Sequence, residues 1–131
     1  MVFDPTQDRR EFYRVPYRTP LKYRSYTQRG ASEAVSQNVS QSGILFQTQD
    51  NPPAISSIVW MSMDFRTLGI CKEIEGRALI LKNGLIGKVV RVEEDTKNSS
   101  AYDVGVCFLT KNQKDTKEVQ DILAEVSKES V

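Results

Sequence analysis

Apolar and polar residues alternate one by one in two well-separated segments, and this alternation limits the possible folds more than any other feature of the chain. Apolar side chains occupy every second position between residues 59 and 65, and again between residues 102 and 108. A period of two is typical of a β-strand with one buried face. We therefore expect both segments to be half-buried strands.

Proline, glycine and asparagine divide the first half of the chain into further strands. Residues 15–27 mix β-favouring and basic residues, with Pro16 and Pro20 placed where the start or edge of a strand tolerates the lost N–H. Residues 33–48 indicate a strand that breaks at 38–43 and then resumes. The break contains a short amide, hydroxyls and a glycine, which favour a tight turn.

The dipeptide Asn83-Gly84 is the strongest short hairpin signal in the sequence, because both central positions of the favoured turn need a positive φ. We expect it to join a strand at 77–82 to a strand at 85–92. Residues 67–76 are ambiguous, and residues 93–101 indicate a polar loop.

The C-terminal segment changes to the period of an amphipathic helix, and either Thr110 with Gln113 or Asp115 is suited to cap it. Five or six antiparallel strands with one helix predict an all-β fold, a small antiparallel, six-stranded barrel that closes to remove exposed edges. We expect an N-terminal arm at 1–14, the barrel at 15–110 and the helix at 111–131. The apolar stripe of the helix consists of Val119, Ile122, Leu123 and Val126.

Charge and composition exclude several functions. The 131 residues carry 18 Lys+Arg and 17 Asp+Glu, so no strong overall field attracts a nucleic-acid polymer or an acidic membrane. The absence of histidine removes imidazole acid–base chemistry and His-ligated zinc. The start of the chain is charged where a signal peptide needs an apolar core, so we expect a cytoplasmic protein. Cys71 and Cys107 are expected to be buried, unpaired thiols.

Two short polar motifs stand out. Arg10 and Arg14 present planar guanidinium forks, which match phosphate oxygens and the O6/N7 edge of guanine. The second motif, Asn38-x-Ser40-x-x-Gly43, lets backbone approach a ligand closely. Each motif alone usually marks a solvated surface or a simple turn. Together they suit an anionic guanine nucleotide.

In this order, Arg10-x-x-x-Arg14 and Asn38-x-Ser40-x-x-Gly43 resemble the two-part signature of PilZ domains, which are receptors for the bacterial second messenger cyclic di-GMP. Segments 87–94 and 102–108 also look like the closing strands of that family's barrel, so the resemblance covers nearly the whole chain. It implies that the arginines bind guanine edges and phosphates, while Asn38, Ser40 and Gly43 shape the opposite wall of the site.

Two positions qualify this resemblance. Arg9 stands where an arginine accompanies binding of a stacked, self-paired ligand dimer in this family, although a solvated charge is an equal alternative. Asn38 stands where the family often has aspartate, and its neutral amide attracts an arginine or a guanine amine less strongly.

The resemblance implies a receptor rather than an enzyme, with no metal, no cofactor and no membrane insertion. Its partners would be cyclic di-GMP and an unidentified effector protein, reached by rearrangement of the arm. Three rivals remain: a PilZ-like interaction module that binds no nucleotide, a barrel that binds single-stranded nucleic acid through Lys22, Tyr23 and Arg24, and a barrel flavoenzyme.

Overall fold

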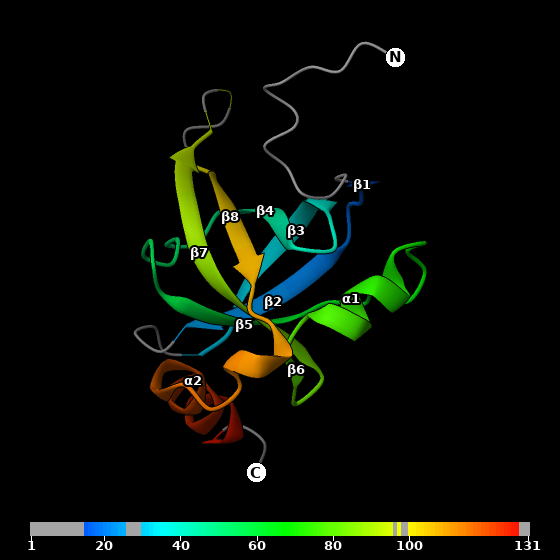
Figure 1. The fold of residues 1–131 in the computed structure, drawn as a ribbon. Coiled ribbons are helices and arrows are strands. Elements are labelled where there is room, and N and C mark those ends of the chain that lie inside the picture. The colour runs from blue at the N-terminus through cyan, green and yellow to red at the C-terminus, as the bar shows by residue number, and fades with distance from the viewer. Residues whose placement is uncertain (1–14, 26–29, 96, 98–99, 129–131) are drawn as a thin grey trace.

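The computed structural model describes residues 15–25, 30–95, 97 and 100–128, and a thin grey trace in Figure 1 marks the other residues. Short strands predominate and belong to one sheet. In chain order the elements are β1 (Val15–Pro16), β2 (Pro20–Ser25), β3 (Ser32–Val39), β4 (Gly43–Thr48), β5 (Ile58–Ser62), α1 (Cys71–Arg77), β6 (Ile80–Leu81), β7 (Gly84–Glu94), β8 (Tyr102–Phe108), a 3₁₀ helix (Lys111–Gln113) and α2 (Lys117–Lys128).

Six strands form a closed antiparallel ring in the order β3, β2, β5, β7, β8 and β4, because β4 pairs again with β3. Outside the ring, β1 pairs with β3 and β6 pairs with β7. Figure 1 shows β1 near one end of the ring and α2 at the other. The expected six-stranded barrel with a C-terminal helix is confirmed.

The barrel interior is filled by the alternating apolar residues of the strands. Val59 and Met61 are fully buried, as the period of two predicts. The ring of Tyr23 packs against that of Phe46 at a centroid distance of 5.0 Å with a tilt of 31°. Its hydroxyl donates to the Thr48 hydroxyl at 3.2 Å, so the one polar group of this aromatic pair is satisfied inside the barrel.

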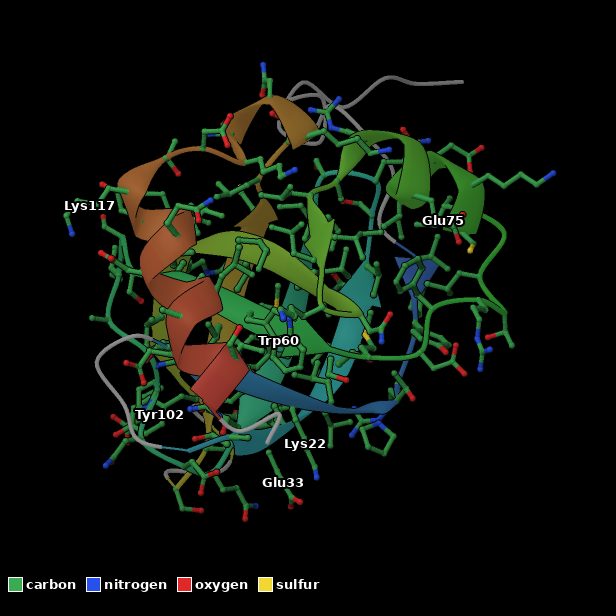
Figure 2. All side chains as sticks on the ribbon, turned by 90° about the horizontal axis from the view of Figure 1, so that it is seen from below. Lys22, Glu33, Trp60, Glu75, Tyr102 and Lys117 are labelled. Atoms are coloured by element: carbon green, nitrogen blue, oxygen red, sulfur yellow. The ribbon has the colours of Figure 1, made fainter. Side chains whose placement is uncertain are left out.

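A second apolar cluster lies outside the barrel, under α2. The helix buries Val119, Ile122 and Val126, which confirms the predicted stripe, against residues of β5 and β7. Trp60 packs beside this helix, as Figure 2 shows, and its indole Nε1 donates to the Leu81 carbonyl at 2.9 Å. The capping box of Thr110 and Gln113 caps the preceding 3₁₀ helix rather than α2. No helix in the described ranges is long and apolar enough to cross a membrane.

The hairpin between β6 and β7 differs from the expectation by one residue. The two central residues are Lys82 and Asn83, with φ of 55° and 62°, and Gly84 pairs with Leu81 as the first residue of β7. A Cβ atom at Gly84 would lie 2.2 Å from the indole of Trp60. Packing against the tryptophan, rather than a positive φ, therefore requires this glycine.

The strand expected at 77–82 is mostly absent, because α1 runs to Arg77 and β6 contains only Ile80 and Leu81. The helix is held by a single fully buried side chain, Ile74, and begins without a side-chain cap. The cysteines are unpaired, as expected, but not buried: Cys71 is half-exposed and Cys107 is exposed.

Candidate functional site

The predicted motif at 38–43 forms the connection between β3 and β4. These are two strands paired antiparallel, rather than one strand interrupted and resumed. The Ser40 N–H donates to the Gly43 carbonyl at 2.9 Å, and the Ser42 N–H donates to the Ser40 hydroxyl oxygen at 3.2 Å. Ser40 is buried, so its hydroxyl fixes the shape of this turn from within.

Gly43 lets the turn lie directly against β8. It faces Cys107 across the β4–β8 pair, and the Phe108 N–H donates to the Ser42 carbonyl at 2.8 Å. A Cβ atom at Gly43 would lie 2.4 Å from the Val106 carbonyl oxygen, closer than any side chain allows. The glycine is therefore required by close backbone approach, as the motif predicted.

Asn38 follows a β-bulge and has an unusual side chain. The register of β3 against β4 shifts between Ser36 and Asn38, which leaves Gln37 without a partner on β4. The side-chain oxygen Oδ1 of Asn38 is buried, and none of the described residues donates a hydrogen bond to it. A buried acceptor without a donor costs about 1–3 kcal/mol, so this atom is a candidate contact for a ligand or another segment.

The described chain begins beside this asparagine. In β1, Val15 pairs with Val39 and Pro16 pairs with Asn38. The structure thus brings Asn38, Ser40 and Gly43 together in one hairpin. Arg9, Arg10 and Arg14 lie outside the described residues.

Hydrogen bonds hold the segment between β1 and β2 against the bulge. The Tyr17 N–H donates to the Gln37 carbonyl at 3.1 Å, and the Thr19 N–H donates to the Ser36 hydroxyl oxygen at 2.9 Å. The same Ser36 hydroxyl donates to the Tyr17 carbonyl. These hydrogen bonds therefore fix the course of the chain between β1 and β2.

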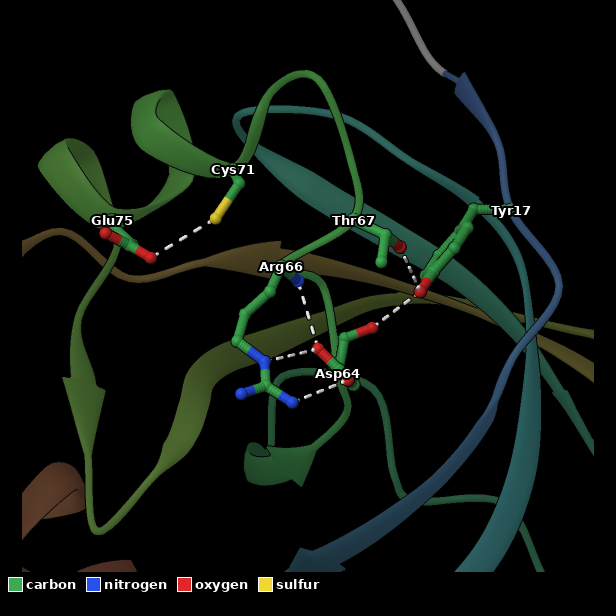
Figure 3. Close-up of polar contacts among 6 residues, drawn as sticks. All are labelled: Tyr17, Asp64, Arg66, Thr67, Cys71 and Glu75. Atoms are coloured by element: carbon green, nitrogen blue, oxygen red, sulfur yellow. Dashed lines mark hydrogen bonds and ion pairs between the residues drawn. The ribbon is translucent and has the colours of Figure 1, made fainter.

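Tyr17 also connects this segment to the loop that precedes α1, a contact that the sequence did not indicate. Figure 3 shows its hydroxyl donating to the Asp64 carbonyl at 2.7 Å, with the Thr67 hydroxyl 3.3 Å away. Hydrogen bonds from Arg66 lower the pKa of the Asp64 carboxyl from 3.8 to about 2. The hydrogen bond from Cys71 to Glu75 raises the pKa of the thiol.

An open groove of about 930 Å³ is lined by residues of β2, the start of β3 and the end of β4, among others, and by none of the three motif residues. Its rim carries charges of both signs, including Arg18, Lys22, Glu33 and Asp50. Such a mixed rim gives no specific attraction for a dianionic ligand. We therefore place the candidate nucleotide site at the hairpin and not in this groove.

The rival surface for single-stranded nucleic acid is contradicted. Tyr23 is fully buried inside the barrel and Arg24 is buried under α2, so of the three proposed residues only Lys22 is exposed. Stacking of bases requires exposed aromatic faces.

Among the described residues, no group of three acidic or cysteine side chains is arranged to hold a metal ion.

A closed antiparallel barrel with a polar hairpin at one end and a covering helix at the other defines a small β-barrel domain. The model of the PilZ domain family matches residues 8–125 of this chain. The chain therefore belongs to the PilZ domain family, whose members are receptor or binding modules.

A solved structure supports the fold. The Bacillus subtilis inhibitor of motility (MotI/DgrA) superimposes with a TM-score of 0.55 at 12% sequence identity, over 92% of this chain. The match spans only 53% of that chain, so the present sequence corresponds to about half of its length. A search of curated proteins by sequence gives no match.

Proposed function

We propose that this protein binds cyclic di-GMP where β1, β3 and β4 meet. In this proposal Arg10 and Arg14 bind guanine edges and phosphates from one side. Asn38, Ser40 and Gly43 form the other side, and Arg9 contributes if the ligand binds as a stacked pair. No catalysis, metal or cofactor is involved, and the receptor acts in the cytoplasm.

The buried oxygen of Asn38 is the observation that carries this proposal. Within the described ranges it accepts no hydrogen bond, although it lies directly opposite Pro16. A guanine amine or an arginine guanidinium is a suitable donor for a carbonyl oxygen. A ligand that brings either group to Asn38 adds a hydrogen bond whose absence is costly.

Chain connectivity keeps the two arginines within reach of Asn38. Arg14 directly precedes Val15, and consecutive Cα atoms are about 3.8 Å apart. Arg10 precedes Val15 by five residues, a span of at most about 18 Å when extended. Because Val15 pairs with Val39, both guanidinium groups can contact a ligand held at the hairpin.

The energetic balance favours reversible binding. Each bidentate arginine contact with guanine contributes about 1–3 kcal/mol of discrimination. Fixing the backbone of each residue that becomes ordered on binding costs about 1–2 kcal/mol. These terms offset each other, as a receptor that must release its signal requires.

The proposed output is a change in the arm that a partner protein recognises. Tyr17 joins the segment next to the arm to the loop before α1, so rearrangement of the arm is positioned to alter that loop. A ligand shifts such an equilibrium only through differential affinity for the two states. The family implies outputs in motility, surface attachment or polysaccharide production, and the structural similarity to a protein named as an inhibitor of motility favours the first.

Calorimetric titration of the purified chain with cyclic di-GMP tests the proposal. We expect saturable heat from the wild type and its loss in Arg14→Ala. Lys117→Ala is the matched control, since it removes a cation from an exposed ion pair on α2, at the other end of the barrel. A wild type that gives no heat would favour a PilZ-like interaction module that binds no nucleotide.

A further inference from the structure

The β-bulge in β3 separates two side chains that would otherwise share a face of the sheet. Ser36 and Asn38 are two residues apart, and side chains at that spacing in a regular strand point to the same side. The bulge inserts Gln37 between them, so Ser36 lies opposite the fully buried Phe46, whereas Asn38 lies opposite the partly exposed Leu45. Ser36 is itself fully buried. The bulge therefore directs Ser36 into the barrel and turns Asn38 to the outer face.

Ser36 binds the backbone of the segment between β1 and β2. Its N–H donates to the Thr19 carbonyl at 3.0 Å, and its hydroxyl oxygen accepts the Thr19 N–H at 2.9 Å. One residue thus satisfies both backbone groups of Thr19, with a hydroxyl in the place that a strand carbonyl usually takes. The same hydroxyl donates to the Tyr17 carbonyl. We refer to these hydrogen bonds as the Ser36 clamp.

The Ser36 clamp holds the chain at a point where the strand pairing is short. β1 has two residues, Val15 and Pro16, and the proline has no N–H to donate to β3. From β1 to Pro20, every residue is at least partly exposed, and Leu21 is the first buried residue of the described chain. Hydrogen bonds therefore matter more than side-chain burial for the attachment of this segment.

We infer that Ser36 is a positioning residue for the nucleotide: its clamp fixes the chain just after Arg14 and so keeps the guanidinium groups of the arm close to Asn38. The inference rests on the proposed function and goes beyond it, because it assigns a role in affinity to a residue that touches no ligand. Ser36 is fully buried, so its effect on binding must pass through Tyr17 and Thr19.

The length of chain between Arg14 and the nearest fixed residue determines the size of the effect. With the clamp in place, Arg14 precedes Tyr17 by three residues. Without the clamp, the next firmly packed residue is Leu21, which is seven residues from Arg14. The effective concentration of a tethered group falls roughly as the −3/2 power of the tether length, so this change lowers it about fourfold.

Titration of wild type, Ser36→Ala and Thr48→Ala with cyclic di-GMP tests this inference. Thr48 is the matched control, because its hydroxyl is also buried and bonds with Tyr23, Glu33 and Asp50 at the end of β4 away from the hairpin. Both variants should lose stability in urea. We expect Ser36→Ala to weaken cyclic di-GMP binding about fourfold to tenfold, while Thr48→Ala should bind as the wild type does.

Two further measurements separate positioning from a general loss of structure. Hydrogen exchange of the Thr19 amide should be faster in Ser36→Ala and unchanged in Thr48→Ala, because only the first variant removes its acceptor. Inserting Gly-Ser-Gly-Ser between Arg14 and Val15 lengthens the same stretch of chain while Ser36 stays intact. The insertion should weaken cyclic di-GMP binding by a similar factor, about fourfold.

Wild-type affinity in Ser36→Ala or in the insertion variant, together with lost binding in Arg14→Ala, would overturn the inference and leave the proposed function intact. Equal losses of affinity in Ser36→Ala and Thr48→Ala would also overturn it, since a general loss of structure would then explain both. A wild type that does not bind cyclic di-GMP would overturn the inference and the proposed function together.

Discussion

The hydroxyl of Tyr17 donates a 2.7 Å hydrogen bond to the backbone carbonyl of Asp64, which lies 47 residues further along the chain. This bond joins the segment that follows the motif arginines to the loop before α1. Tyr17→Phe keeps the ring and removes the bond, so we expect it to lower the free energy of unfolding by about 0.5–1.5 kcal/mol. Urea unfolding of the two proteins measures this difference.

The same variant tests the relay. In the wild type, cyclic di-GMP should change hydrogen exchange of the backbone amides at 64–67, because Tyr17 couples them to the arm. In Tyr17→Phe the nucleotide should still bind, but this change should be reduced. An unaltered exchange response would show that the signal leaves the site by another route.

Asn38→Ala should separate binding from stability. Because no described residue donates to Oδ1, removal of this oxygen should leave the free energy of unfolding unchanged or slightly raised. Affinity for cyclic di-GMP should fall at least tenfold, since the ligand loses its acceptor. Thermal unfolding and calorimetry measure the two effects. A strongly destabilised variant with wild-type affinity would contradict the assignment of Asn38 to the site.

Gly43→Ala should destabilise the barrel, because the new methyl group would lie 2.4 Å from the Val106 carbonyl oxygen and force β4 away from β8. Such overpacking costs about 1–3 kcal/mol. Gly76→Ala is the matched control, since a Cβ atom at this position of α1 meets no atom within 4 Å. Alanine in a helix is favoured over glycine by about 0.5–1 kcal/mol, so the control should be slightly stabilised. Urea midpoints that shift in opposite directions from the wild-type value in the two variants would support this account.

Ionisation of the Tyr23 hydroxyl should lower the stability of the folded protein at alkaline pH. Burial raises the pKa of its hydroxyl above 10.0, while the hydrogen bond with Thr48 partly opposes the shift. The unfolded chain therefore releases this proton first as the pH rises. The contribution of Tyr23 to the free energy of unfolding is fully present below about pH 10 and is lost as the pH rises through the folded-state pKa.

Urea unfolding between pH 8 and pH 11 measures this decline, and Tyr23→Phe should make it shallower. Equal slopes in the two proteins would show that Tyr23 ionisation does not contribute.

The strands were predictable because buried and less buried side chains alternate between consecutive residues of the sequence. Val59 and Met61 alternate with less buried residues, and the structure places them in the core. The hairpin at Asn83 is displaced by one residue from the prediction. Gly84 is required by close packing against the indole of Trp60, which lies on another strand, and not by the turn. Helix α1 was missed because seven residues with one buried side chain, Ile74, give no detectable helical period.

The site was only partly predictable. The spacing of Asn38, Ser40 and Gly43 identified the tight turn, which depends on local residues, but not that the turn joins two antiparallel strands. Tyr17 gave no comparable signal, since its hydroxyl contacts Asp64, which lies 47 residues further along the chain. The roles of Arg9, Arg10 and Arg14 stay predictions that the titrations address.

The closure of the ring has a consequence for recognition by other proteins. Each of its six strands has a neighbour on both sides, so a partner has no open backbone ladder in the ring to extend with a strand of its own. Recognition must therefore depend on side chains and on the segments attached to the ring. Substitutions on the surface can therefore change which partner is recognised while the barrel itself stays unchanged.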